Sequence, residues 1–224
     1  MIKLAIFDLD GTLLDTRTDL GNACNYALSE CGFPKRNLDD YCMLVGRGID
    51  NLFRKAMPES EASEENVKRM RSVFVPYYTE HIADYTLPYK GIVEMLETLR
   101  AAGISLAVAS NKFQSGTENL VGKFFSGFDF VKILGQREGN PLKPDAAIVK
   151  ECIAGYEALR GEKIELSEVV YVGDSDVDMK TGINARVTTI GVLWGFRTRE
   201  ELAAYNPYLL AATAEEISET VLGL

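Results

Sequence analysis

Short apolar runs alternate along the chain with segments in which apolar residues recur every three or four positions. The short runs have the length and the β-branched content of buried strands. They cover residues 2–7, 104–110, 128–134, 168–174 and 187–193. Segments of helical periodicity, such as residues 91–103 and 145–159, lie between them. Apolar strands that alternate with helices predict a parallel sheet covered on both faces, which is a doubly wound, Rossmann-like α/β fold.

The first two predicted strands are separated by more chain than one crossover needs. A crossover takes about 12 residues including its helix, whereas roughly 95 residues separate these strands. The surplus has helical periodicity, and we expect a small helical cap domain at residues 17–87, inserted into an α/β core of residues 1–16 and 88–224. The cap would overhang the carboxyl end of the first strand, where open α/β sheets bind ligands. Its hinges should lie near residues 14–18 and 83–91.

The composition excludes several classes of function. The chain has 24 basic and 33 acidic residues, for a formal charge of −9, so we expect no binding to nucleic acid or to an anionic membrane. No apolar run reaches the ~18 residues of a membrane span, and the N-terminus lacks the pattern of a secretory leader. Four cysteines without a C-x-x-C pair, and a single histidine, argue against a zinc site. We expect a cytoplasmic monomer or homodimer.

Two aspartates follow the first predicted strand. Asp8 and Asp10 are two residues apart and therefore point to the same side of an extended chain. At a separation of ~4 Å their carboxylates would repel each other by about 4 kcal/mol at an effective dielectric of ~20. The fold must offset this cost with a cation or use the repulsion.

Further polar residues are expected at the same edge of the sheet. Ser110 and Asn111 close the second strand, Lys143 precedes a helical segment, and Asp174 and Asp178 follow the fourth strand. Carboxylate oxygens with open positions suit Mg²⁺, which binds one or two carboxylates together with substrate phosphate. The lysine and the Ser-Asn turn would hold phosphate oxygens. The set predicts a magnesium-assisted reaction of a small phosphorylated metabolite, with one aspartate as the nucleophile.

These motifs, in this order, resemble those of a known superfamily. D-x-D-G-T at residues 8–12, Ser110, Lys143 and G-D-x-x-x-D at residues 173–178 are similar to the four motifs of the haloacid dehalogenase-like (HAD) hydrolases. The helical insert resembles the C1 cap of that superfamily. V-G-x-G in the cap and W-G-F near the last strand are similar to its phosphoglycolate-phosphatase branch.

The resemblance implies hydrolysis of a small phosphate monoester through an aspartyl-phosphate. Asp8 would attack phosphorus, while Asp10 would protonate the leaving alcohol and then take a proton from water. Asp8, the main-chain carbonyl of Asp10, and Asp174 would ligate Mg²⁺. Within this branch, 2-phosphoglycolate is the favoured substrate, and another phosphoester or pyrophosphate is the alternative.

The resemblance also assigns supporting roles. Three groups would stabilise the transferring phosphoryl: Ser110, the Asn111 amide and Lys143. Asp178 would orient Lys143 or a metal-bound water, Gly11 would let the backbone turn beside the phosphate, and Thr12 would support that turn. Arg47, between two glycines of the cap, would suit a substrate carboxylate or a second phosphate, and a solvated arginine is the alternative.

Other reactions of the superfamily differ at identifiable residues. Dehalogenases lack the second aspartate, so Asp10 argues against them. Phosphonatases carry a cap lysine, and Lys35, Lys55 and Lys68 lie in no stretch that resembles that site. Sugar-phosphate mutases of the β-phosphoglucomutase type share every core motif, and only Thr12 favours hydrolysis over them. A non-catalytic regulator that binds phosphometabolites would have lost a core residue, and none is missing here.

Overall fold

The structure, a computed structural model, describes residues 1–224 and is built around one six-stranded parallel sheet. The strands are β1 (Leu4–Phe7), β4 (Ser105–Phe113), β5 (Phe130–Gln136), β6 (Val169–Gly173), β7 (Thr188–Val192) and β8 (Leu209–Ala211). Their order is β5-β4-β1-β6-β7-β8. The chain therefore builds outward from β1 in one direction and then in the other. Ligands bind at such a switch point in open α/β sheets, beyond the carboxyl ends of the strands.

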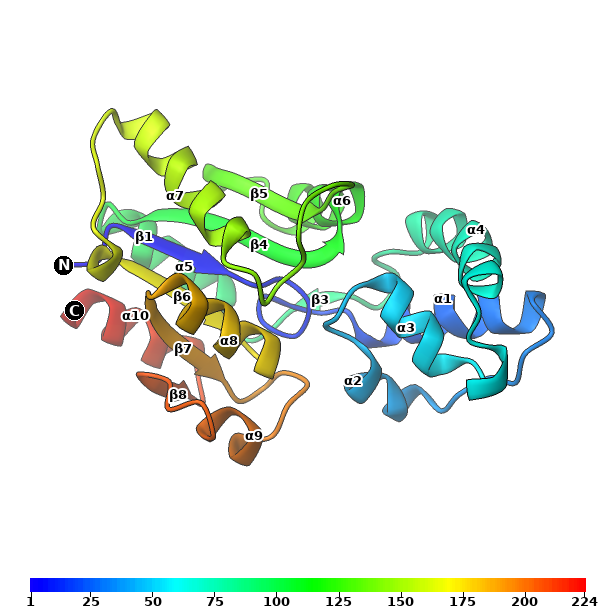
Figure 1. Cartoon of the computed structure of the whole chain (residues 1–224). Helices are drawn as coiled ribbons and strands as arrows, with labels where there is room; N and C mark the ends of the chain where they lie inside the picture. Colours follow the sequence, from blue (N-terminus) through cyan, green and yellow to red (C-terminus); the bar gives the residue numbers. More distant parts are fainter.

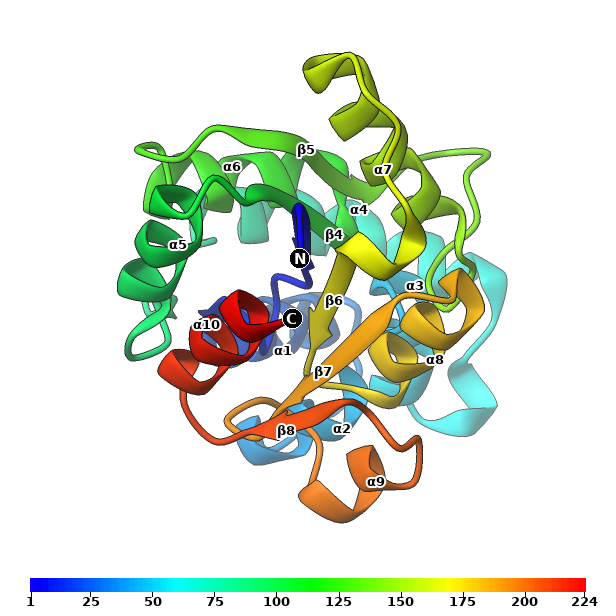
Figure 2. The ribbon, with the colours of Figure 1, turned by 90° about the vertical axis from the view of Figure 1, so that its left-hand side faces the viewer.

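Helices cover both faces of this sheet. They are α5 (Ile92–Ala101), α6 (Gln114–Phe124), α7 (Ala147–Arg160), α8 (Asp176–Ala185), α9 (Arg199–Ala203) and α10 (Ala214–Gly223). Leu4 and Ile6 of β1 pack in the hydrophobic cluster that contains α7, while Ala5 and Phe7 pack in the cluster that contains α5, α6 and α10. Figure 2 shows α7 and α8 on one side of the strands and α5 and α10 on the other. The predicted doubly wound α/β fold is confirmed.

The five predicted strands are all present, with shifted ends. β4 extends three residues past the predicted end at residue 110 and carries Asn111 and Lys112 as part of the strand. Its pairing with β5 shifts register between Ala109 and Phe113, which is a bulge or irregularity near the carboxyl edge. The sequence pattern does not predict strand β8, because two half-buried residues and one buried residue at a sheet edge give too short a pattern. No helix combines the length and the hydropathy that a transmembrane span requires.

Four α-helices lie within residues 17–87, beside the carboxyl end of the sheet (Figure 1). They are α1 (Arg17–Glu30), α2 (Tyr41–Leu44), α3 (Ile49–Ala56) and α4 (Glu64–Glu80). In Figure 1 they form a group at the right, away from the two chain termini. We call residues 17–87 the helical insert. Its assignment as a cap domain that opens and closes stays a prediction.

The two connections to the insert run side by side. Strands β2 (Leu14–Asp15) and β3 (Leu87–Pro88) form an antiparallel pair. The buried carboxylate of Asp19, at the start of α1, accepts hydrogen bonds from Tyr85 N (3.1 Å), Thr86 N (2.8 Å) and Thr86 Oγ1 (2.7 Å). The two segments that connect the insert to the sheet, residues 14–19 and 85–88, are therefore hydrogen-bonded to each other at the predicted hinges.

Candidate active site

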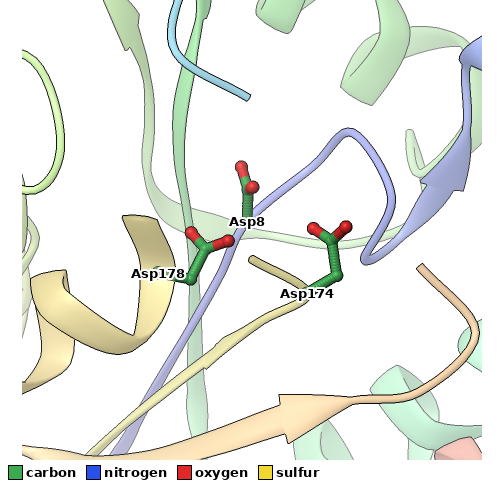
Figure 3. Close-up of side chains that lie close together, drawn as sticks. All are labelled: Asp8, Asp174 and Asp178. Carbon is green, nitrogen blue, oxygen red and sulfur yellow. The ribbon is translucent and has the colours of Figure 1, made fainter. Parts of the chain in front are cut away.

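Three buried carboxylates meet where β1 and β6 end. The main-chain N–H of Asp8 still donates to Val172 O of β6 (2.9 Å), which fixes Asp8 at the sheet edge. Asp174 directly follows β6, and Asp178 lies in the first turn of α8. One oxygen from each carboxylate lies within 4.8 Å of the other two. Figure 3 shows the three side chains together, with Asp8 between Asp174 and Asp178.

One lysine lies among these acids. Lys143 Nζ is 2.9 Å from Asp8 Oδ1 and 2.8 Å from Asp178 Oδ1, and its side chain is almost fully buried. It also donates to the hydroxyl of Tyr171 (3.0 Å), which in turn donates to Asp178 Oδ1 (3.0 Å). Three ionised carboxylates and one ammonium give the cluster a formal charge of −2. A divalent cation would neutralise this charge, so the donor set fits Mg²⁺.

The same burial shifts the pKa values of the acids. Burial, with the charge of Asp178 added, raises the pKa of Asp8 to about 7, although Lys143 opposes the shift. Burial also raises the pKa of Asp174 well above its ordinary value, with Asp178 and Asp8 adding to the effect. These carboxyl groups therefore favour the protonated form unless a further positive charge lies beside them.

Asp174 is held in place by the loop after β1 and by the loop after β7. Thr12 Oγ1 donates to its Oδ1 (3.2 Å), and Phe196 N donates to its Oδ2 (2.7 Å). Gly11 has a φ of +85°, and a Cβ at that position would overlap Asp174 Oδ2. Gly11 and Thr12 thus both contact Asp174, a partner that the sequence motif does not reveal.

Asp178 is fixed by the helix that carries it. Its Oδ2 accepts from Ser175 N (3.0 Å) and from Ser175 Oγ (2.5 Å). Asp178 N donates back to Ser175 Oγ (3.4 Å), which completes a capping box at the start of α8. Its Oδ1 remains directed at Lys143 and Tyr171. The capping box orients the carboxylate that pairs with Lys143, because both of its oxygens are then committed.

Asp10 lies outside the three-acid cluster and has a lysine of its own. Lys112 Nζ is 3.0 Å from Asp10 Oδ1 and 3.2 Å from Oδ2, and it also donates to the hydroxyl of Tyr78 on α4 (2.7 Å). Lysines thus offset part of the expected repulsion between Asp8 and Asp10, since each acid has a separate cationic partner. No sequence pattern marks Lys112, Tyr78 or Tyr171 as site residues, and the helical spacing of Tyr78 predicts only packing in the cap core or at the domain interface.

Ser110 and Asn111 lie on β4, directly before Lys112. Both are buried, and Ser110 Oγ accepts from Lys112 N (3.2 Å). The side-chain amide of Asn111 donates to Lys143 O and to Gly46 O (both 3.1 Å), and its Oδ1 accepts from Lys143 N (2.9 Å). This side chain therefore positions the Lys143 loop and contacts the helical insert.

A cavity lies between the acids and the helical insert. Its empty volume is about 490 Å³, part of it open to solvent. The sheet side contributes Asp8, Asp10, Ser110, Asn111, Lys112 and Phe113, and the insert contributes Leu20, Val45, Gly46, Gly48, Ile49, Leu52 and Phe74. The wall formed by the insert is thus largely apolar, and Lys112 is the only basic side chain that lines the cavity.

Arg47 does not line this cavity, although the glycines on either side of it do. Its guanidinium pairs with Asp176 Oδ2 (2.6 Å) and is about two-fifths exposed. The core makes a second contact nearby, where buried Arg197 donates to Cys42 O and to Val45 O. In this arrangement Arg47 joins the insert to the core, and its expected contact with substrate stays a prediction.

Comparisons with known proteins agree on one family. The sequence model of the family described as haloacid dehalogenase-like hydrolase matches residues 5–192. A phosphoglycolate phosphatase of Agrobacterium fabrum is 33% identical over 195 residues, which are 86% of this chain and 81% of that protein. One of Vibrio vulnificus strain CMCP6 is 31% identical over 229 residues, which are 99% and 96% of the two chains.

Solved structures are also similar over the whole chain. The crystal structure of a proposed phosphoglycolate phosphatase from Lactobacillus delbrueckii subsp. bulgaricus superposes with a TM-score of 0.87 at 33% identity, and the match covers 99% of each chain. A predicted phosphoglycolate phosphatase from Haemophilus somnus 129pt gives a TM-score of 0.86 at 26% identity, covering 98% and 97%.

Proposed function

The chain belongs to the haloacid dehalogenase-like hydrolase family and is a phosphatase, and we propose that it hydrolyses a small phosphate monoester, 2-phosphoglycolate first among the candidates, with Mg²⁺ as cofactor. The observation that carries this proposal is the buried cluster of Asp8, Asp174 and Asp178 with its single lysine. With all three acids ionised, the net charge of −2 suits a divalent cation, and the adjoining cavity is lined by both Asp8 and Asp10.

Asp8 is the proposed nucleophile. Its carboxylate lies on the cavity wall, held by Lys143 and by the hydrogen bond of Leu9 N to its own Oδ1 (2.7 Å). A carboxylate oxygen attacks phosphorus as the bond to the ester oxygen breaks, which leaves an aspartyl-phosphate and the leaving alcohol. Water then attacks the same phosphorus, releasing inorganic phosphate and the free carboxylate.

Asp10 is the proposed acid and base. It also lines the cavity, two residues from the nucleophile, and it is not shared with the three-acid cluster. In the first step its carboxyl proton passes to the leaving oxygen, and in the second step its carboxylate takes a proton from the attacking water. Ser110 and Lys143 lie near the nucleophile and would bind the phosphoryl oxygens.

Asp8, Asp174 and the main-chain carbonyl of Asp10 would hold Mg²⁺, with Asp178 beside them. When bound, the ion would supply positive charge against the phosphoryl oxygens. The raised pKa values of Asp8 and Asp174 support this assignment, because a cation at that point keeps both groups ionised at neutral pH.

The cavity favours a small ester over a sugar phosphate. The wall formed by the insert includes the apolar residues Leu20, Ile49 and Phe74. The hydroxyl groups of a sugar would find no hydrogen-bond partners on these side chains. This observation supports hydrolysis over the mutase reaction. The relatives from Agrobacterium and Vibrio favour 2-phosphoglycolate among small esters.

Phosphate release with and without Mg²⁺ tests the proposal. We expect a kcat/KM for 2-phosphoglycolate at least ~100-fold above those for sugar phosphates, nucleotides and pyrophosphate, which is about 2.7 kcal/mol of discrimination. Asp8→Asn should abolish turnover and leave the fold intact. A different ranking of substrates would overturn the choice of 2-phosphoglycolate, and turnover that survives Asp8→Asn would overturn the mechanism.

A further inference from the structure

Lys112 is a buried cation whose position the catalytic assignments above do not explain. It lies on β4, two residues after Ser110, and its side chain is about 2% exposed. The three oxygens around its ammonium are both carboxylate oxygens of Asp10 and the hydroxyl of Tyr78. An ammonium carries three N–H bonds, and these three contacts match them in number.

Tyr78 comes from a different part of the chain. It lies on α4 of the helical insert and is fully buried, with its ring stacked on Phe74 (centroids 5.1 Å apart). Phe113 of β4 packs edge-on against the same ring (6.1 Å), and Lys112 Nζ lies 4.7 Å from its centroid. The groups around the ammonium therefore come from both parts of the chain. Asp10 and Phe113 belong to the core, and Tyr78 belongs to the insert.

We propose that Lys112 is a positioning residue for Asp10, and that Tyr78 positions Lys112, so that the acid is aligned only while α4 is seated against β4. The inference rests on the proposed role of Asp10 as general acid. Lys112 neither gives nor takes the proton in this scheme. It holds both oxygens of the acid, and a carboxyl group that rotates out of line would deliver its proton poorly to the leaving oxygen.

Two aryl esters of similar shape separate this role from a structural one. p-Nitrophenolate is a weak base that leaves without a proton, whereas phenolate is more basic and gains from protonation. Lys112→Met should therefore lower kcat/KM for phenyl phosphate at least ~10-fold more than for p-nitrophenyl phosphate, since general acids contribute about 10²–10⁴-fold. Tyr78→Phe keeps the ring. It should lower the ratio of kcat/KM for phenyl phosphate to kcat/KM for p-nitrophenyl phosphate in the same way, by a smaller factor.

Matched variants control for simple damage to the fold. Tyr77→Phe changes the neighbouring position on α4, where the ring stacks on Tyr26 outside the cavity, and Lys163→Met removes an exposed lysine. Neither variant should change the ratio of the kcat/KM values for the two esters. In an Asp10→Asn background the ratio should also stop responding to Lys112→Met, because the group being positioned is gone.

Each result decides the proposal. An equal loss on both esters, or a ratio that still responds to Lys112→Met when Asp10 is Asn, overturns the positioning role and leaves the phosphatase mechanism standing. A wild-type enzyme that hydrolyses neither ester overturns the proposed function together with this inference. The aryl pair does not depend on 2-phosphoglycolate, so a wrong choice of natural substrate would not imitate either failure.

Discussion

Gly11 has two roles in this site: its backbone adopts a positive φ, and its missing side chain leaves space for Asp174. A positive φ of 85° excludes most side chains at this position, and the space beside it is already filled by Asp174. The tight approach brings Thr12 within hydrogen-bond distance of Asp174. The glycine therefore serves the geometry of an acid that lies more than 160 residues away in the sequence.

Gly11→Ala is expected to damage the acid cluster beyond the cost of backbone strain. The new Cβ would overlap Asp174 Oδ2, so that carboxylate must move. We expect a loss of at least ~10-fold in kcat/KM and weaker Mg²⁺ dependence, measured by phosphate release across a Mg²⁺ titration. Gly32→Ala is the matched control, because Gly32 has a φ of +77° and a Cβ added there would meet nothing within 4 Å. Similar activity in the two variants would contradict this account of Gly11.

At the scale of elements, several polar contacts from the core to the helical insert meet one short segment, residues 42–47. Arg197 binds the carbonyls of Cys42 and Val45, Asn111 binds the carbonyl of Gly46, and Arg47 pairs with Asp176. These contacts lie directly beside the cavity-lining glycines. They favour the arrangement in which the insert covers the acids, which is the arrangement that would exclude bulk water during catalysis.

Arg197→Met should weaken that arrangement without touching the acids. If only part of the population has the insert seated, apparent affinity falls by that fraction, so KM should rise about 3- to 10-fold with a smaller change in kcat. Steady-state kinetics with the best substrate would measure the split. Arg199→Met, at an exposed position on α9, is the control. A pure loss of kcat would argue that Arg197 acts on the chemical step instead.

Sequence patterns predict this fold and much of the acid site for a physical reason. Buried parallel strands must be apolar along their length, so the polar residues that end them, such as Asp8 and Ser110, stand out. Lys112 does not stand out, because a lysine after an apolar strand is typical of a solvated end. The contact made by the Tyr78 hydroxyl cannot be predicted from the sequence either. An aromatic residue at helical spacing predicts core packing of its ring and gives no information about the partner of its hydroxyl. The pairing of Arg47 with Asp176 depends on how two distant segments meet, which no local pattern records.

At the scale of the whole molecule, the acid cluster ties folding stability to pH and to metal. A carboxylate that gains a cationic partner on folding has a lowered pKa, and it stabilises the fold as pH rises. Glu151 is an example, because its hydrogen bond with Arg137 lowers its pKa. Asp8 and Asp174 behave in the opposite sense, since their pKa values are raised. The folded protein thus retains protons that the unfolded chain has already released, and such groups oppose folding at high pH.

The sign and the window of this effect follow from Asp8. Its pKa moves from 3.8 to about 7, so between about pH 4 and pH 7 the unfolded chain is ionised while the folded state still holds the proton. The contribution of this group to stability is intact below pH 4, falls as pH rises through that window, and is fully lost above pH 7. Asp174 acts in the same direction. A cation that binds the ionised carboxylates should reverse the loss, most strongly where they are ionised.

Thermal unfolding at about pH 5.5 and about pH 8, with chelator or with millimolar Mg²⁺, measures this coupling. We expect Mg²⁺ to raise Tm more at the higher pH, by at least ~3 °C, because a gain of about 1 kcal/mol shifts Tm by about 2–4 °C in a chain of this size. In Asp8→Asn the metal-free Tm at the higher pH should exceed that of the wild type, and the response to Mg²⁺ should shrink. A Mg²⁺ effect of the same size at both pH values, or one unchanged by Asp8→Asn, would show that the ion acts elsewhere on the molecule.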